Sequence, residues 1–487
     1  MDSIYIKKEN IDKFDSWLPE NYLCKRDEVT NFTNSWTTLK EINATVLDGW
    51  RFSENMKSDW YKKHITNIQR TSKATSNEID LAERYEQTIK QSLFYRMRHI
   101  EPMKLNVESH LMRPPSIDHL TSCVKKGDVL IRRIGSICAS IVSNYHRQHP
   151  VDANVAIIRG LELNQAIWLS FCLNQLWYRR YLEQIGAGTT MIRAGVKQLE
   201  QMPIAEMPTG FVALAKIYYK KYSALAYSQE RLYNLRLSVN NWLTQKLSGS
   251  NFYTKIGTPD IKSTYIQSRH INDQLTYAAS WQASLSEELI SDYNCQKLTK
   301  LALINPKSKY VSDPLQQTHV VKISDINSQL SVNKPEQNDF GWRTLKSTLM
   351  PFDVLISTFV QEPRVAIIAQ ELKTLPLVSE QLAILRFHHA PGAYALLMET
   401  ELIIEQMRAL AHGTTQRFIQ HKMLEQIVIP EIEQSLAYSW HQQLLELQQE
   451  KEMLEQEISL LLEQMYSIYR TIHPEQNITR TSNEPTH

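Results

Sequence analysis

The sequence predicts an α+β protein in which one arrangement, a globular part followed by a long helix, occurs twice. Three observations support this prediction. Short strings recur along the 487-residue chain at one constant offset of 225 positions. A long segment with a seven-residue apolar period follows each set of repeated strings, as in a coiled coil. Short apolar runs of the kind found in buried strands lie among the repeated strings.

The internal repeat is visible in the second part of each half. The recurring strings are DVLI at 128–131 and 353–356, GTT at 188–190 and 413–415, and LEQ at 199–201 and 424–426. AIIR at 156–159 resembles AILR at 383–386, with the offset slipped to 227. Any one match is weak, but three strings with one offset indicate a duplicated chain. The first 100 residues of each half show no clear match.

Each globular part is expected to mix strands and helices. The expected elements of the first copy are strands at 129–131, 140–142 and 155–158 and a helix over 165–183. The second copy repeats this layout with a strand-rich segment over 350–386 and a helix over 394–410. Pro203 and Pro430 precede the long helical segments, as expected for residues that interrupt regular structure.

The two long segments read as coiled-coil helices because their apolar residues alternate three- and four-residue steps. The predicted seam consists of Leu225, Leu232, Leu235, Val239, Leu447, Leu454, Ile458, Leu461, Met465 and Ile468. Residues 211–243 hold five basic and one acidic residue, whereas 421–470 hold three basic and nine acidic residues. Opposite charges favour pairing of the two helices with each other. The alternative is that each helix packs on its own globular part.

Composition narrows the classes of function. Lys and Arg number 54 against 52 Asp and Glu, which excludes a histone-like polycation but allows a local basic face. Neither a P-loop string nor GxGxxG occurs, and only 13 glycines are present. The five cysteines lack CxxC spacing, and no His/Cys cluster suggests zinc. The sequence therefore predicts no catalytic residues, no metal and no cofactor.

The N-terminal segment and the apolar runs bear on localisation. No apolar run approaches the roughly 18–20 residues that a membrane span needs. The first residues alternate charged and apolar side chains and lack the layout of a signal peptide. We therefore expect a cytoplasmic protein with no membrane partner.

Basic residues near the repeated strings are candidates for DNA contact. They are Lys125, Lys126, Arg132, Arg133, Arg193, Lys197, Arg417 and Lys422. Such side chains can follow a phosphate backbone. The alternative is that they are solvated residues around strands.

One set of residues loosely resembles the metal site of a nuclease. Asp353 followed by Glu371 and Lys373 could hold a divalent ion, as carboxylates and a lysine do in nucleases. The first copy has His146 where the second has Glu371, so the repeat does not contain this constellation twice. A metal-dependent nuclease is therefore a minor alternative.

The order of these strings resembles the specificity subunit of type I restriction-modification systems. The strings are KGDVLI at 126–131, GTT at 188–190, LEQMP at 199–203 and their second copies FDVLI at 352–356, GTT at 413–415 and LEQIVIP at 424–430, each set followed by a heptad helix. Phe352 stands where the family usually has glycine, which predicts a turn built differently from the first copy.

The resemblance implies two target-recognition domains that read a split, asymmetric DNA sequence, with pseudo-two-fold symmetry. The implied division is 1–208 and 249–432 for these domains, 209–248 and 433–473 for long antiparallel spacer helices, and 474–487 for a disordered tail. The implied partners are double-stranded DNA, two methyltransferase subunits and a restriction or translocase subunit. A coiled-coil scaffold, or a recognition component of a related defence system that never touches DNA directly, is the alternative.

Overall fold

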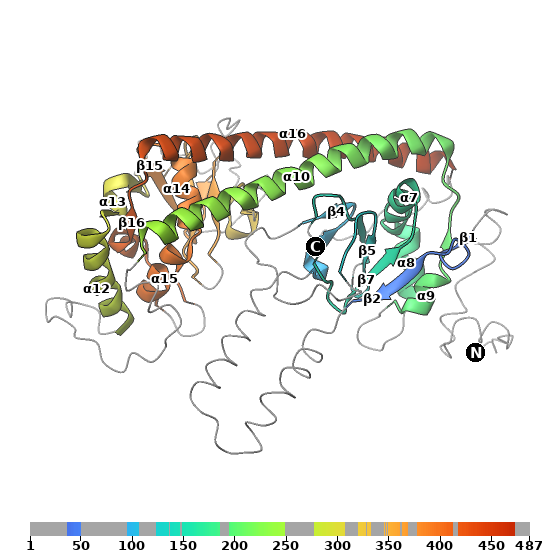
Figure 1. Ribbon diagram of the computed structural model, residues 1–487, viewed down its shortest axis with the longest axis horizontal. Coiled ribbons are helices and arrows are strands. Elements are labelled where there is room, and N and C mark those ends of the chain that lie inside the picture. The colour runs from blue at the N-terminus through green and yellow to red at the C-terminus, as the bar shows by residue number, and fades with distance from the viewer. Residues whose placement is uncertain are drawn as a thin grey trace, which may run out of the picture. The chain divides into compact units, whose positions relative to one another are not determined.

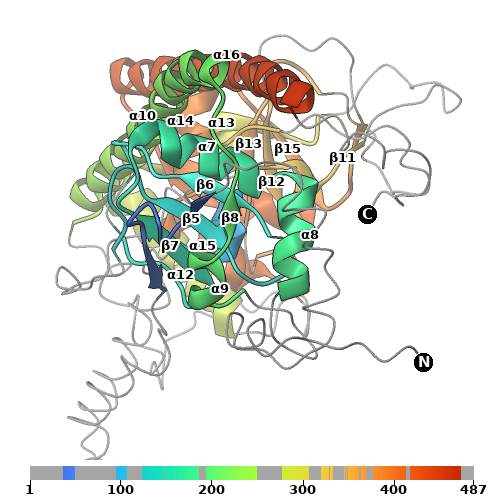
Figure 2. The same ribbon diagram turned by 90° about the vertical axis from the view of Figure 1, so that its right-hand side faces the viewer.

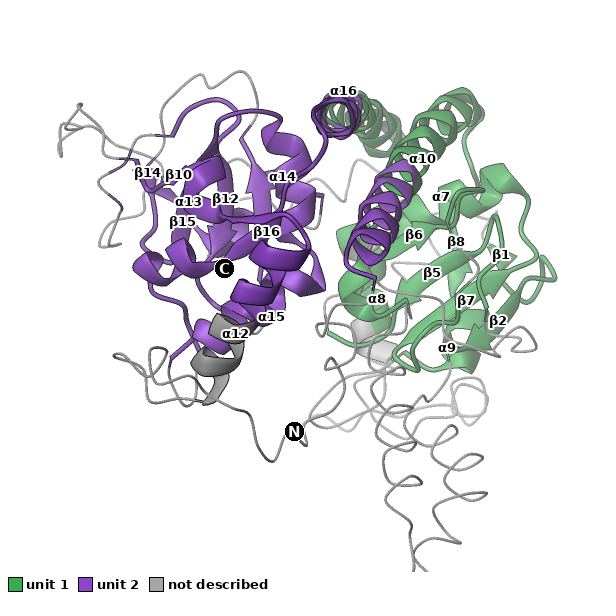
Figure 3. Cartoon of the chain, turned by 60° about the vertical axis from the view of Figure 1, so that its left-hand side comes forward, with its two compact units in different colours: residues 1–230, 452–487 green, residues 231–451 purple. Residues whose placement is uncertain are grey.

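The computed structural model divides the chain into two compact units (Figure 3). Unit 1 comprises residues 1–230 and 452–487, and unit 2 comprises residues 231–451. The residues that the structure describes are 37–49, 95–106, 123–135, 137–146, 149–185, 194–248, 277–306, 320–327, 329–332, 345, 347, 349–360, 363–368, 377–412 and 417–472.

The sheet of unit 1 has four antiparallel strands. In order across the sheet they are β2 (Thr45–Asp48), β7 (Val155–Arg159), β5 (Val129–Arg132) and β6 (Ala139–Ile141). Helix α7 (Leu163–Leu173) packs against β5 and β6 (Figures 1 and 2). Both faces of β5, β6 and β7 are buried, which explains their nearly continuous apolar sequences, whereas the edge strand β2 exposes Thr45 and Asp48.

Unit 2 contains a sheet of the same design. Its strand order is β10 (Ala302–Ile304), β15 (Leu382–Phe387), β12 (Val354–Ser357) and β13 (Val365–Ile367). Val354 and Ile356 point into one core, whereas Leu355 points into a second core on the opposite face. This alternation is expected because successive side chains of a strand lie on opposite faces. The mixed α+β fold that the sequence predicts is confirmed.

The duplication extends further toward the beginning of each copy than the repeated strings indicate. In unit 1, β1 (Thr37–Thr38) pairs antiparallel with β8 (Pro203–Ile204); in unit 2, β9 (Cys295–Lys297) pairs antiparallel with β16 (Val428–Pro430). Further helices of the two units are α9 (Val196–Glu200), η2 (Met97–His99), α12 (Tyr277–Asp292), α13 (Leu298–Leu301), η4 (Ile323–Asp325) and η5 (His421–Gln426). A parallel pair, β11 (Val320–Val321) with β14 (Leu377–Val378), completes unit 2.

The single helix predicted over 165–183 is wrong, because the chain forms α7 and then α8 (Leu176–Ile185). Asn174 ends α7 by bonding to strand β6: its Oδ1 accepts from Ala139 N at 3.1 Å and its Nδ2 donates to Ala139 O at 2.8 Å. The second copy breaks at the matching place. There α14 (Pro391–Met398) and α15 (Glu401–Leu410) replace the helix expected over 394–410, with Thr400 between them.

The turn before the central strand is built alike in both copies, contrary to the expectation from Phe352. Gly127 has φ +83° and Phe352, 225 positions later, has φ +67°. A left-handed backbone costs a side-chain-bearing residue about 1–2 kcal/mol. The Phe352 ring packs edge-on against the ring of His441, with the two ring centroids 5.7 Å apart.

Two helices of similar length carry the predicted seam. They are α10 (Thr209–Lys246) and α16 (Gln434–Ile472). In unit 1, Gly210 lies against Ile468, and Lys221 pairs with Glu457 at 2.8 Å. In unit 2, Arg231 pairs with Glu450 at 2.7 Å, and the rings of Trp242 and Trp440 meet at 5.6 Å. In each unit the contacting residue in α16 has a lower number when its partner in α10 has a higher one, so within each unit the two helices run antiparallel.

Each long helix also belongs to both cores. The first half of α10 and the second half of α16 enter the core of unit 1, through side chains such as Tyr218 and Met465. The other halves enter the core of unit 2, through side chains such as Val239 and Leu444. The two alternatives for these helices, pairing together and packing on globular parts, therefore both hold. Of the seam residues, Ile458, Leu461 and Ile468 are half-buried and the others are buried.

Two leucines of α16 offer a matched test of the seam. Leu454 is 8% exposed and Leu460 is 60% exposed. We expect Leu454→Ala to lower the free energy of unfolding by about 2–4 kcal/mol, because it leaves a cavity between the helices. Leu460→Ala on the solvent side of the same helix should change it by less than about 0.5 kcal/mol. Urea unfolding followed by circular dichroism measures both, and equal effects would mean that the seam is not buried.

Candidate nucleic-acid interface

A buried ion pair fixes the turn that carries Lys125 and Lys126. Arg159 on β7 donates to both carboxylate oxygens of Asp128, at 2.9 and 2.6 Å. The same carboxylate also accepts a hydrogen bond from Lys125 N at 2.7 Å. The hydrogen bonds that Arg159 donates to Asp128 raise the pKa of its guanidinium above the usual value. Both lysine side chains are exposed on the rigid turn, where they can meet an anionic surface.

The second copy repeats this pair at Asp353, the aspartate of the nuclease string. Arg386 donates to Asp353 at 2.8 and 2.7 Å, and Asp353 accepts from Met350 N at 2.8 Å. Asp353 is only 1% exposed, so its oxygens are occupied by internal donors. The remaining positions of the nuclease string, Glu371 and Lys373, lie outside the described residues. In the part of the chain that the structure describes, no group of three or more His, Cys, Asp or Glu could hold a metal.

Arg159 and Arg386 are the structural residues that the sequence interpretation missed. The signal was present, because both end the AIIR and AILR strings of the repeat. A buried aspartate requires a cation or several hydrogen-bond donors. The recurring arginine was therefore the natural partner for the recurring aspartate.

The two adjacent arginines at the end of β5, Arg132 and Arg133, differ in exposure. Arg133 is 4% exposed; its Nε donates to Ala194 O at 2.7 Å, and its guanidinium pairs with Asp48. Its charge is therefore neutralised inside unit 1, and little of its side chain is left to contact DNA. Arg132 is half-exposed and lies near the sulfur of Cys138, at 3.8 Å.

The remaining candidates lie at equivalent places in the two units. Lys197 is exposed on α9 and Lys422 is exposed on η5, 225 positions later. Arg417 is exposed and donates to Arg408 O at 2.8 Å. Arg193 and both GTT strings lie outside the described residues.

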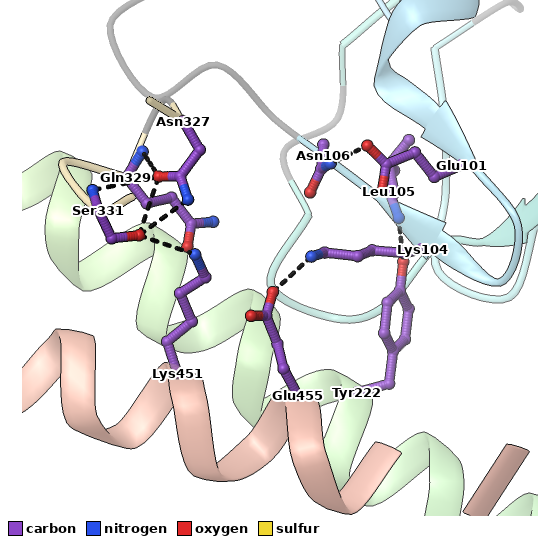
Figure 4. Close-up of polar contacts among 10 residues, drawn as sticks. All are labelled: Glu101, Lys104, Leu105, Asn106, Tyr222, Asn327, Gln329, Ser331, Lys451 and Glu455. Carbon is purple, nitrogen blue, oxygen red and sulfur yellow. Dashed lines mark hydrogen bonds and ion pairs between the residues drawn. The ribbon is translucent and has the colours of Figure 1, made fainter. Parts of the chain in front are cut away.

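A hairpin in each unit is bound to the long helices (Figure 4). In unit 1, the hairpin of β3 (Ile100–Glu101) and β4 (Lys104–Leu105) places Lys104 Nζ 2.5 Å from Glu455, while Leu105 N donates to Tyr222 Oη at 3.1 Å. In unit 2, the matching turn bonds to α16 through Lys451 and Ser331, at 3.3 Å. Each globular part is thus fixed on the helices by polar contacts as well as by its core.

No helix among the described residues combines the length and apolar character needed to cross a bilayer.

The sequence matches no protein-family profile and no curated protein. Among solved structures, the chain is similar to the S subunit of a type I restriction-modification system from M. genitalium, with 11% identity over 77% of this chain and 90% of that chain and a TM-score of 0.36. It is also similar to the HsdS subunit from Thermoanaerobacter tengcongensis, with 14% identity over 80% of this chain and 91% of that chain and a TM-score of 0.24.

Proposed function

We propose that this protein is the DNA-recognition subunit of a type I restriction-modification complex. The observation that carries the proposal is the double use of the long helices. Two units with the same strand order each pack on one half of α10 and one half of α16. Two related readers on a shared antiparallel pair suit a target made of two half-sites.

In this role each unit reads one half of a split, asymmetric target, and the helices set the gap between the halves. Two readers on one scaffold bind more tightly than either alone through effective concentration. The exposed cations Lys125, Lys126, Lys197 and Lys422 are suited to phosphate contact. In this proposal, side chains of loops contact the bases. Partner subunits carry out the methyl transfer. Such a complex works on DNA in the cytoplasm.

Exposed apolar side chains on the long helices support the docking of a protein partner. They include Ile217, Leu237, Tyr438, Met453 and Leu460, each more than two-fifths exposed. Contiguous exposed apolar patches are typical of protein interaction sites, and the seven-residue spacing of Met453 and Leu460 places these two side chains on one face of α16. We assign the face of α16 that carries Met453 and Leu460 to a methyltransferase subunit, and we propose two such subunits per chain in keeping with the duplicated scaffold.

The test is recovery of the tagged full-length chain from its native cells, followed by mass measurement of the complex. We expect a methyltransferase at two copies per chain and, by sequencing of modified DNA, a bipartite methylated target. Met453→Glu with Leu460→Glu should reduce recovery, because it places charges on the docking surface and leaves the buried seam intact. Recovery of unrelated proteins without any methyltransferase would favour the scaffold alternative instead.

A further inference from the structure

The turn carrying Lys125 and Lys126 lies beside a second loop of unit 1. Gly127 N donates to Val142 O at 2.9 Å, so the turn adjoins the start of the loop over residues 142–146. Within that loop, Ser143 N donates to Nδ1 of the buried His146 at 2.9 Å. Burial lowers the pKa of His146 to about 3, so the loop is held by a neutral ring. Turn and loop together present two lysines and the side chain of Tyr145 at one edge of the sheet.

An aromatic contact joins this loop to α10. The rings of Tyr145 and Tyr227 lie 4.8 Å apart, and each residue is 45% exposed. Aromatic side chains carry a large apolar surface that folded proteins tend to bury, and tyrosine adds a hydroxyl that can form hydrogen bonds. Here the paired rings form an exposed platform that links the edge of the sheet to the helix.

Two lysines of α10 continue the same surface. Lys220 and Lys216 precede Tyr227 by seven and eleven residues, a spacing that places all three on one face of a helix. Both lysines are exposed, and within the described part of the chain neither has an ion-pair partner. Lys221, the residue after Lys220, lies on a different side of the helix and forms an ion pair with Glu457 of α16. The charges at 216 and 220 are therefore not neutralised by α16.

These side chains form a basic-aromatic strip, which we define as Lys125, Lys126, Tyr145, Tyr227, Lys220 and Lys216. It contains no acidic residue, and the nearby Asp128 is buried against Arg159. Its α10 portion extends over about 16 Å at 1.5 Å per residue. That length spans several phosphates of one DNA strand, which lie about 3.4 Å apart along the axis.

We infer that the basic-aromatic strip binds the phosphate backbone of duplex DNA, so that α10 contacts DNA in addition to acting as a spacer. Lysines supply the charge, and the tyrosine hydroxyls donate to phosphate oxygens. Because no base edge is involved, these contacts add affinity without adding sequence preference. The inference rests on the proposed function, and it adds contacts by a helix that needs no role in reading the target.

The test compares Lys216→Gln with Lys220→Gln against Lys216→Arg with Lys220→Arg in the full-length chain. The probe is duplex DNA of random sequence, and the dissociation constant is measured at several salt concentrations. The Gln pair should flatten the slope of log Kd against log salt by about 1.8, at about 0.9 per lost phosphate contact. The Arg pair should keep the wild-type slope, because its charge is unchanged.

Each other outcome overturns a stated claim. Equal slopes for the Gln and Arg pairs, with salt-dependent binding by the wild type, would overturn the strip and leave the proposed function standing. Absence of any DNA binding by the wild-type chain and its complex would overturn both. Normal DNA binding by the Gln pair with loss of a protein partner would reassign this face to protein docking, and the inference would be wrong.

Discussion

Replacing Asp353 with Asn should lower the free energy of unfolding by about 3 kcal/mol, the lower end of the range for breaking a buried ion pair. The substitution leaves the Arg386 guanidinium without its counter-charge and weakens the acceptor for Met350 N. The lower end applies because Arg386 retains 25% exposure and water can partly solvate it. Asp128→Asn should have a similar effect in unit 1, where Arg159 stands in the same relation. Urea unfolding followed by tryptophan fluorescence measures both.

Asp325→Asn provides the matched control for Asp353→Asn. The Asp325 carboxylate accepts from Lys322 N at 2.8 Å, the same three-residue backbone bond, but it has no arginine partner among the contacts the structure describes. Its loss should cost about 1 kcal/mol or less. If Asp353→Asn abolished DNA cleavage by the complex while leaving stability unchanged, the ion-pair assignment would be wrong and a metal site would need to be reconsidered.

Inserting seven residues into both long helices should lengthen the gap between the half-sites of the target. The insertion points are after Glu230 in α10 and after Lys451 in α16, where the chain passes from one unit to the other. Seven residues add about 10 Å of helix and leave the helix faces within about 20° of their original direction. The expected change is up to about three base pairs, measured by sequencing the DNA that the complex methylates.

The control for the paired insertion is an insertion in α10 alone. It should disrupt the pairing of seam residues such as Leu225 with α16 and destabilise the chain without producing a new target spacing. An unchanged spacing after the paired insertion, in a complex that still methylates DNA, would contradict the role of the helices as a spacer. The paired design keeps every contact inside each unit, since both insertion points lie at the boundaries between units.

The sequence predicted those parts of the fold that depend on local pattern. Both long helices, the central strands and the duplication follow from apolar periodicity and repeated strings. The equivalence of β1 with β9 was missed, because strands of two and three residues are too short to leave a recognisable string. The break after α7 was missed because it depends on Asn174 bonding to Ala139, 35 residues away in sequence. No local pattern contains such a contact.

The candidate site was only partly predictable for a related reason. Arg132 and Arg133 are adjacent at the end of a strand, and adjacent side chains of a strand point to opposite faces. The sequence therefore allowed one of them to face solvent but could not say which one would be buried. The answer depends on Asp48 and Ala194, which the fold brings to Arg133 from distant segments. Tyr145 and Tyr227 gave no sequence signal, because their contact joins a loop to a helix 82 residues later.

The sharing of α16 between the two cores has a consequence for how the protein is made. Met465 and Tyr469 belong to the core of unit 1, yet they follow all of unit 2 in the chain. A ribosome therefore synthesises residues 1–230 of unit 1, and then all of unit 2, before it reaches the residues of α16 that complete the core of unit 1. Unit 2 can close first, although its residues are made later than most of those of unit 1. Until α16 emerges, the apolar face of α10 that it covers stays open to chaperones or to neighbouring chains.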